Sequence, residues 1–284
     1  MATMKFGLAL PPRNPRVTAD QARMAEAAGW DGIFLGDAIW TVDPMVALGA
    51  AAMVTEHIRL GTMVIPMPIR RPWKVASESL ALDLVSQGRL ILGLGAGAVW
   101  MGWQAFPDEE TDIRPRAEML DESIELLTRF WQGEPFAYEG QHYHVNLSWA
   151  AEHGPGKPVQ QPRIPLWVPG LWPRKASMRR VLKCDGIVVE KLDPEGQSVT
   201  PTPDDVRAIA AYVAEHRTLE TPFDIVVNGE TAGMDPVQRR ETLQAWADAG
   251  ATWWIEGAWN ATDEEVAARI EAGIPDLPAK GGGL

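Results

Sequence analysis

Short apolar segments alternate with amphipathic helical segments along almost the whole chain, which limits the fold to an α/β class. The clearest unit lies between Ile58 and Gly97, where two apolar strands flank one helix. Strands that read as continuous apolar runs are buried on both faces, as in parallel sheets covered by helices. In such sheets, functional residues gather at the carboxyl ends of the strands.

The alternation predicts eight strand–helix units. The predicted strands cover residues 5–10, 32–36, 59–64, 89–94, 165–168, 186–189, 223–227 and 252–255. The predicted helices cover residues 18–28, 43–56, 72–86, 115–131, 173–183, 203–216, 236–249 and 262–272. Eight units in about 270 residues favour a single (β/α)8 TIM barrel over an open doubly wound sheet. Insertions follow strand four (96–112) and the fourth helix (133–163), and the second is predicted to be partly a hairpin.

Local signals predict where several helices begin. Thr18 is predicted to be the N-cap of the first helix, and Pro173 is predicted to open the helix after strand five. Thr262 and Glu265 have the spacing of a capping box for the last helix.

Composition narrows the class of protein further. The 284 residues, 46% of them hydrophobic, can bury a large core, and we expect one domain over 1–276 with a flexible tail at 277–284. The single Cys, Cys184, predicts a buried structural thiol in a reducing compartment. No signal peptide or apolar span is present, so we expect a cytoplasmic protein with no membrane association. A net charge of −12 argues against nucleic-acid binding.

Barrel geometry places the chemistry at the ends of the predicted strands. The residues there are 10–12, 37–40, 62–64, 95–97, 170–172, 190–191, 228–230 and 256–257. This set is rich in small and aromatic residues and contains neither His nor Cys, so no metal site and no metal hydrolase is predicted. A site that is mostly small and flat suits a planar organic cofactor.

The run Gly93–Ala98 leaves three interpretations open. It formally fits a dinucleotide fingerprint, but that fingerprint needs a helix to start at the glycines. An immediate helix is opposed by Trp100, Gly102, Trp103 and Pro107. The glycines therefore either admit a cofactor against bare backbone or form a plain tight strand end.

Five segments, taken together in their order and spacing, carry a family resemblance. They are Ala27–Asp37 (AAGWDGIFLGD), Ile58–Val64 (IRLGTMV), Ser86–Leu90 (SQGRL), Arg116–Pro135 (beginning RAEMLDESIELL) and Pro165–Gly170 (PLWVPG). Over most of residues 4–260 the chain resembles the bacterial luciferase-like family of flavin-dependent oxidoreductases.

The resemblance implies a barrel that binds FMN or the deazaflavin F420 at its carboxyl-terminal face. In the family, a non-proline cis peptide or bulge supports the flavin ring, and here it would fall at Met63–Val64. The implied cofactor-binding residues around the ring are Thr62, Met63, Val64, Gly95, Ala96 and Gly97.

The turn after strand five is the predicted phosphate end of the cofactor site. Gly170, Leu171 and Trp172 precede a helix start, where backbone N–H groups attract an anion. Arg174 would add positive charge, although a solvated surface cation is the alternative for this residue and for Lys175.

One departure from the family concerns proton transfer. Many members carry a His directly after the acidic residue that ends strand two, whereas this chain reads Asp37-Ala38. Asp37 is therefore the predicted catalytic group, and its alternative role is to cap a loop or pair with a cation. Glu190 and Glu256 are weaker candidates, since a carboxylate at a strand end often only caps a loop.

The predicted function is a monooxygenase-type oxidoreductase that uses reduced FMN and oxygen on a small apolar or aromatic substrate. Trp40, Trp100 and Trp103 are the predicted walls of the substrate pocket. The alternatives are F420-dependent hydride transfer, a flavin-binding protein with little catalysis and, weakest, a cofactor-free barrel hydrolase or isomerase. A separate flavin or F420 reductase is the expected partner, and a homodimer stays open.

Overall fold

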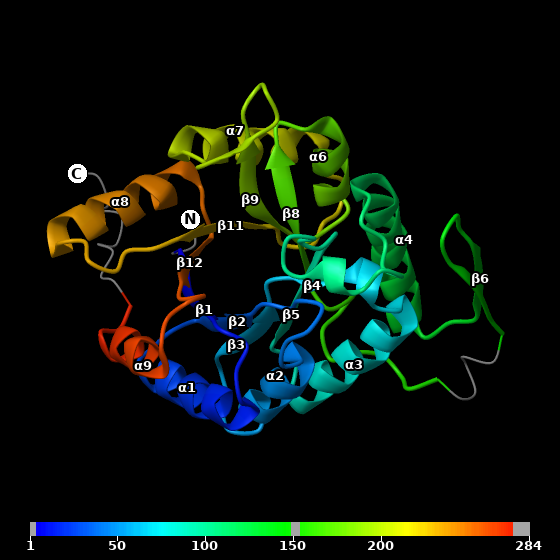
Figure 1. Ribbon diagram of the computed structural model, residues 1–284, viewed down its shortest axis with the longest axis horizontal. Coiled ribbons are helices and arrows are strands. Elements are labelled where there is room, and N and C mark those ends of the chain that lie inside the picture. The colour runs from blue at the N-terminus through cyan, green and yellow to red at the C-terminus, as the bar shows by residue number, and fades with distance from the viewer. Residues whose placement is uncertain (1–3, 149–153, 275–284) are drawn as a thin grey trace. The chain divides into compact units, whose positions relative to one another are not determined.

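The computed structural model describes residues 4–148 and 154–274 (Figure 1). Eight strands follow one another through the main sheet, and the eighth pairs with the first. In sheet order they are β1 Lys5–Leu10, β2 Gly32–Leu35, β3 Arg59–Thr62, β5 Leu90–Gly95, β8 Leu166–Trp172, β9 Gly186–Leu192, β11 Asp224–Gly229 and β12 Trp253–Gly257. The fold is therefore the predicted (β/α)8 TIM barrel.

The helices and the remaining strands complete this pattern. The α-helices are α1 Pro15–Ala27, α2 Pro44–Ala52, α3 Pro72–Val85, α4 Ile113–Gln132, α6 Lys175–Val181, α7 Pro203–His216, α8 Pro236–Ala249 and α9 Asp263–Glu271. The short additional strands are β4 Ile65–Pro66, β6 Phe136–Glu139, β7 His144–Leu147 and β10 Ser198–Val199. Two 3₁₀ turns, Met67–Ile69 and Trp103–Ala105, lie in the loops after β4 and β5.

Contacts divide the chain into two compact units, which are described separately. Of the described residues, the first unit holds 4–11, 21–34 and 167–274, and the second unit holds 12–20 and 35–166. The predicted single domain over 1–276 stays a prediction, and the predicted tail at 277–284 lies outside the described residues.

Aromatic rings form the core of the first unit. Phe34 stacks on Trp167 with ring centroids 5.2 Å apart, and Trp253 meets the two rings edge-on at 5.6 and 5.5 Å. Gly186 lies directly against Trp167, where even a methyl side chain would clash with the indole. Large rings and glycines therefore fit together in this core, as close packing requires.

In the second unit, a buried arginine joins the loops before β3 and β5. The Arg89 guanidinium donates to the carbonyls of Ala52, Thr55 and Ile58 and to the Thr55 hydroxyl, at 2.8–3.0 Å. These contacts lie at the amino ends of the strands, the stabilising face of a barrel. Arg89 therefore has a structural role at the amino ends of β3 and β5, away from the carboxyl ends where the candidate site residues lie.

Most of the predicted helices are confirmed, and two of the predicted helix starts are wrong. Helices α7 and α8 have the predicted bounds, and Thr262 and Glu265 form the predicted capping box of α9. The predicted N-cap at Thr18 is wrong, because Asn14 Oδ1 accepts the Arg16 N–H at 3.0 Å and α1 begins at Pro15. The helix predicted from Pro173 begins only at Lys175.

Strand ends differ more from prediction. The strand predicted over 59–64 stops at Thr62 and resumes as β4, while β8 and β9 run to Trp172 and Leu192, beyond their predicted ends. The insertion at 133–163 contains the predicted hairpin, β6–β7. Within residues 4–148 and 154–274, no helix is both long and apolar enough to cross a membrane.

Candidate active site

The ion pair of Asp37 with Arg70 is the centre of the candidate site in the second unit. Arg70 Nε lies 2.8 Å from Asp37 Oδ2, and Arg70 Nη2 lies 2.8 Å from Asp43 Oδ2. A third carboxylate, Glu78, lies 3.7 Å from Arg70 Nη1. One guanidinium therefore holds the loop after β2, the start of α2 and the helix α3 together.

The balance between burial and the charge of Arg70 shifts the pKa values of Asp37 and Asp43 in opposite directions. The side chain of Asp37 is only 3% exposed, and this burial raises the carboxyl's pKa even though the charge and hydrogen bond of Arg70 oppose the rise. Burial also acts on Asp43, but there the hydrogen bond and charge of Arg70 outweigh it, so the pKa is lowered. Asp43 in addition accepts the N–H groups of Met45 and Val46 as the N-cap of α2. Asp37 is thus the carboxyl of this pair that takes up a proton more readily.

The ends of β3 and β5 form a platform of small residues. The peptide between Met63 and Val64 is cis, as the family resemblance implied. A side chain at Gly95 would place its Cβ 2.5 Å from Val64 Cγ2, and Gly93 lies against the Thr62 backbone. At the junction of the two strand ends, the Val64 side chain therefore fills the space that a side chain at Gly95 would take.

Thr62, predicted to contact the cofactor, instead uses its hydroxyl to join β3 to β5. Its hydroxyl donates to the Gly93 carbonyl and accepts the Gly93 N–H, both at 2.9 Å, and its side chain is fully buried. The hydroxyl has no exposed surface, so Thr62 joins β3 to β5. Met63 and Val64 are half-buried and accessible.

A buried arginine that the sequence analysis missed holds the loop after β5. Arg116, on α4, donates from Nη1 to the carbonyls of Ala96 and Gly97 at 2.9 Å each. Its guanidinium lies 5.4 Å from the centre of the Trp103 ring. Gly97 has φ +85° and packs against Trp103 so closely that a Cβ would clash. The backbone of this loop is therefore fixed where it leaves the strand.

The three tryptophans predicted to wall a substrate pocket differ in exposure. Trp40 is 87% exposed and Trp100 is 82% exposed, each in a loop of the second unit. Trp103 is only 1% exposed, and its buried ring packs against Gly97 in the loop after β5. Their roles toward a substrate stay predictions.

In the first unit, two of the backbone N–H groups predicted to be available to a phosphate, those of Leu171 and Arg174, already donate hydrogen bonds within the protein. The Leu171 N–H donates to Ser177 Oγ at 3.0 Å, and the Arg174 N–H donates to the Leu171 carbonyl at 2.7 Å. Gly170 packs against Ile187 with no room for a side chain, and Trp172 lies edge-on to Tyr212 at 5.9 Å. Arg174 is exposed, so its side chain is accessible to a ligand.

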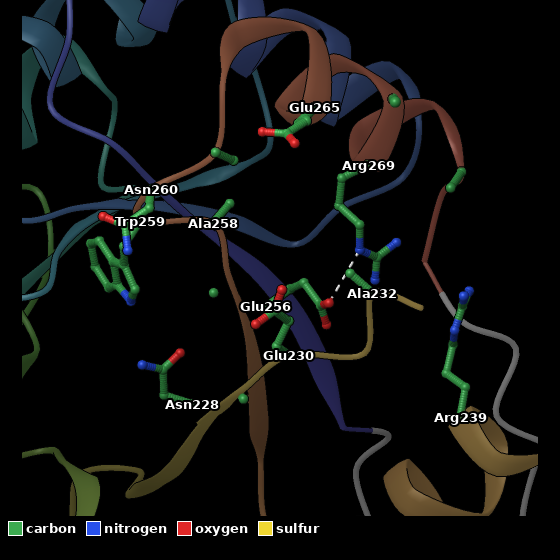
Figure 2. A pocket seen from close by; sticks show the side chains of 15 residues that line it. Asn228, Glu230, Ala232, Arg239, Glu256, Ala258, Trp259, Asn260, Glu265 and Arg269 are labelled. Carbon is green, nitrogen blue, oxygen red and sulfur yellow. Dashed lines mark ion pairs between the residues drawn. The ribbon is translucent and has the colours of Figure 1, made fainter. Parts of the chain in front are cut away.

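Glu256, the weaker candidate at the end of β12, is held by a dense set of donors. It accepts the Thr231 N–H at 2.7 Å, the Thr231 hydroxyl at 3.0 and 3.1 Å and the Trp254 Nε1–H at 2.9 Å. Arg269 adds an ion pair, with its Nε 3.3 Å from Glu256 Oε1, as the dashed line in Figure 2 shows. Because the side chain is only 1% exposed, Glu256 has the loop-capping role that was its alternative.

Glu190 differs from Glu256 because no ion pair with another described residue fixes it. It is accessible at the end portion of β9, yet the protein around it removes enough water to raise the carboxyl's pKa. It stays a weaker candidate for proton transfer. Within the part of the chain that the structure describes, no group of three or more His, Cys, Asp or Glu side chains could hold a metal ion.

The sequence analysis found the strand-end residues but missed their arginine partners. Arg70, Arg116 and Arg269 lie on or beside helices, 33, 20 and 13 positions from Asp37, Ala96 and Glu256. The available signal for Arg116 was its place inside the RAEMLDESIELL segment, where a charged residue lies on the buried side of the helix.

A TIM barrel whose candidate site residues lie at the carboxyl ends of its strands has the arrangement found in barrel enzymes. The profile of the luciferase-like monooxygenase family matches residues 4–277. The chain belongs to the luciferase-like monooxygenase family.

Individual relatives include proteins with two kinds of cofactor. A Mycobacterium tuberculosis protein, provisionally described as a coenzyme F420-dependent oxidoreductase, is 34% identical over 202 residues, 65% of this chain and 55% of that protein. The oxygenase component of a flavin-dependent trigonelline monooxygenase from Acinetobacter baylyi is 28% identical over 151 residues, 51% of this chain and 40% of that protein. The chain thus spans about half the length of these two curated relatives.

A solved structure supports the fold independently. The coenzyme F420-dependent tetrahydromethanopterin reductase of Methanopyrus kandleri has a TM-score of 0.72 and 17% identity, covering 96% of this chain and 99% of that one. At this identity the likeness concerns the fold alone. The two curated relatives are thus described by their names as an F420-dependent and a flavin-dependent oxidoreductase.

Proposed function

We propose that the chain is an oxidoreductase that uses a reduced flavin-type cofactor, FMN or F420, on a small organic substrate. The observation that carries the proposal is the junction of the β3 and β5 ends, where Met63 and Val64 are half-buried and accessible and Val64 packs on Gly95. A flat cofactor ring fits such a surface, whereas a substituted strand end would hold it away. Family membership supports the same choice.

The residues proposed to hold the cofactor are those that the resemblance implied. Met63, Val64, Gly95, Ala96 and Gly97 would support the ring, with Thr62 buried behind them. Residues Gly170, Leu171, Trp172 and Arg174 are the proposed contacts for the phosphate end. When bound, reduced FMN supplies electrons for oxygen activation, whereas reduced F420 supplies a hydride.

The chain's own contribution to the reaction is a proton and a dry surface. Asp37 is proposed to give or take a proton at Oδ1 or Oδ2, because its raised pKa favours the protonated form more than in an ordinary aspartate. Arg70 keeps that carboxyl in one orientation through the 2.8 Å contact. The loop fixed by Arg116 shields the neighbouring backbone from water.

The two reaction types are separate candidates, and each has an observation in its favour. Monooxygenation with FMN and oxygen is supported by the A. baylyi relative, and hydride transfer with F420 is supported by the M. tuberculosis relative. In the monooxygenase case we propose a separate flavin reductase as partner. A cytoplasmic location and a homodimer stay proposals as well.

A binding experiment tests the cofactor proposal directly. Purified protein is titrated without oxygen with reduced FMN and, separately, with reduced F420, and binding is followed by absorbance and fluorescence. We expect tight binding of one of them. The Gly95→Ala variant should weaken it by at least about tenfold, because the new methyl collides with Val64. The matched control is Gly49→Ala, a helix position with open space.

The outcome also separates the candidates. Oxygen consumption coupled to substrate loss with bound FMN supports monooxygenation, and substrate reduction without oxygen supports hydride transfer. Absence of binding to both reduced cofactors would contradict the proposed function. Tight binding with no turnover of any substrate would favour the alternative of a flavin-binding protein.

A further inference from the structure

Glu78, on α3, is the carboxylate of the Arg70 cluster to which the proposed chemistry assigns no role. Its Oε2 lies 3.7 Å from Arg70 Nη1, so it feels the charge of Arg70 but receives no hydrogen bond from it. The hydrogen bonds of Arg70 to side chains reach Asp37 from Nε and Asp43 from Nη2, each at 2.8 Å. Three carboxylates therefore share one guanidinium, and all four side chains belong to the second unit.

The positive charges around these carboxylates do not balance the negative ones. Lys74 lies one turn before Glu78 on α3 and is exposed, so water and salt screen its charge. Burial acts on Asp43, but the hydrogen bond and charge of Arg70 outweigh it, so the pKa of Asp43 is lowered. Asp43 therefore stays ionised as the pH falls and neutralises Arg70. Asp37 and Glu78 are left without a compensating charge of their own.

Asp37 and Glu78 lie close enough to affect each other's ionisation. Each has an oxygen within 3.7 Å of a nitrogen of the same guanidinium, so these oxygens are less than about 10 Å apart, the Debye length at about 0.1 M salt. Asp37 is 3% exposed and Glu78 is 35% exposed, so screening is weaker than between two surface charges. Burial raises the pKa of Glu78, the charge of Arg70 opposes the rise, and the charges of Asp43 and Asp37 add to it.

The influence of one carboxyl on the other is mutual, because a coupling free energy between two sites is the same in both directions. The charge of Asp37 makes Glu78 hold its proton more tightly, so the charge of Glu78 does the same to Asp37. A protonated Glu78, in turn, leaves Arg70 to Asp37 and Asp43, which favours the ionised form of Asp37.

We propose that Asp37 and Glu78 act as one coupled acid across Arg70, in which Glu78 is the positioning residue that sets how firmly Asp37 holds its proton. The coupling of the two carboxyls is independent of any cofactor, whereas its use in catalysis rests on the proposed function. In that function, Glu78 extends to higher pH the range over which Asp37 can donate a proton.

Carboxyl titration by nuclear magnetic resonance tests the coupling without cofactor or substrate. The full chain, labelled with carbon-13 in its Asp and Glu side chains, is titrated with acid, and the variants that lack Asp37 or Glu78 assign the two signals. In Glu78→Gln, the titration of Asp37 should move to lower pH. In Asp37→Asn, the titration of Glu78 should move to lower pH by the same number of pH units, since the coupling is reciprocal.

Two further variants make this titration specific. The matched control is Glu125→Gln, because Glu125 is also paired with an arginine, Arg129 on α4, and lies outside the Arg70 cluster. It should leave the titration of Asp37 in place. Glu78→Asp keeps the negative charge on α3, so it should shift Asp37 less than Glu78→Gln does.

An unchanged titration of Asp37 in Glu78→Gln, or an equal shift in Glu125→Gln, would overturn the proposal. If Glu78→Gln folds poorly, the titration of Glu78 in Asp37→Asn measures the same coupling. An unchanged titration of Glu78 in that variant would overturn the proposal equally.

The pH profile of turnover tests the catalytic use of the pair. The limb of the profile that Asp37 controls should move to lower pH in Glu78→Gln, in the same direction as the titration of Asp37. A purely structural role of Glu78 would lower the stability of the variant without moving this limb, and that result would overturn the assignment of Glu78 as a positioning residue. Failure of the proposed function is seen separately, as absence of binding to either reduced cofactor.

Discussion

Asp37 and Glu256 are both carboxylates at the carboxyl end of a barrel strand, yet their surroundings differ. Asp37 follows β2 in the second unit, and Glu256 ends β12 in the first unit. Each is nearly buried and each pairs with an arginine, at 2.8 Å for Asp37 and 3.3 Å for Glu256. From the sequence alone both are strand-end acids with a capping role as the alternative.

The number of donors separates the two carboxylates. Three donor groups from two residues, the N–H and hydroxyl of Thr231 and the indole N–H of Trp254, reach Glu256 in addition to its arginine. Asp37 shares its arginine with Asp43 and Glu78, and burial raises its pKa. A saturated carboxylate holds structure, whereas a buried carboxylate with few donors is suited to exchange a proton.

The largest expected effect comes from removing the saturated carboxylate. Glu256→Ala leaves the Arg269 charge without its buried partner and removes the acceptor for Thr231 and Trp254, so stability should fall by about 3–5 kcal/mol. Urea unfolding followed by circular dichroism measures this change. The control is Glu230→Ala, a nearby exposed glutamate, which should unfold like the native chain. Equal stability of Glu256→Ala and the native chain would refute the structural role.

The next effect concerns the carboxylate with few donors. Asp37→Asn keeps the shape but cannot exchange a proton, so turnover should fall by about 100-fold while cofactor affinity and stability change little. Steady-state kinetics and cofactor titration measure the two quantities. Asp235→Asn is the matched control, because Asp235 is the exposed N-cap of α8 outside this cluster and asparagine caps a helix as well as aspartate does. Turnover that survives in Asp37→Asn would remove Asp37 from the mechanism.

The smallest expected effect is a change in pH dependence. A carboxyl whose pKa is raised on folding stabilises the folded state less as pH rises through that pKa, because the ionised form is the one that burial disfavours. The stability of the native chain should therefore decline over this range relative to Asp37→Asn. Thermal unfolding between pH 4 and 8, compared for the two proteins, measures the difference; parallel curves would contradict it.

The pH profile of turnover tests the role of Arg70. Lysine is a point charge that cannot reach two carboxylates as a fork does, so Arg70→Lys should raise the pKa of Asp37 further. The acid limb of the turnover profile should move to higher pH. An unchanged limb would mean that Arg70 only holds the loop in place.

Secondary structure could be predicted well where local chemistry decides it. Pro203 after the Thr202 cap and Pro236 after the Asp235 cap mark helix starts within one residue, and Gly250 marks an end. Pro173 failed as a start signal because Arg174 is extended and serves as the N-cap of α6. The cap at Asn14 was overlooked because Thr18, inside α1, carries an equally good capping side chain.

The candidate site could be predicted only in part for a related reason. Because a strand end is marked by the local pattern of residues, the positions of Asp37, Met63 and Gly95 at strand ends could be predicted from the sequence. The partners Arg70 and Arg269 were not, since tertiary folding alone brings them to Asp37 and Glu256. Buried arginines of this kind resemble surface arginines until their neighbours are known.

The two contacts of Arg116 with Ala96 and Gly97 have an evolutionary consequence. One guanidinium on a helix fixes the first turn of a long loop through its backbone carbonyls, which every residue type provides. The tip of the loop, with Trp100 and Met101 exposed, has no such constraint. We therefore expect the fold to tolerate substitutions at the tip better than substitutions in the glycine run behind it.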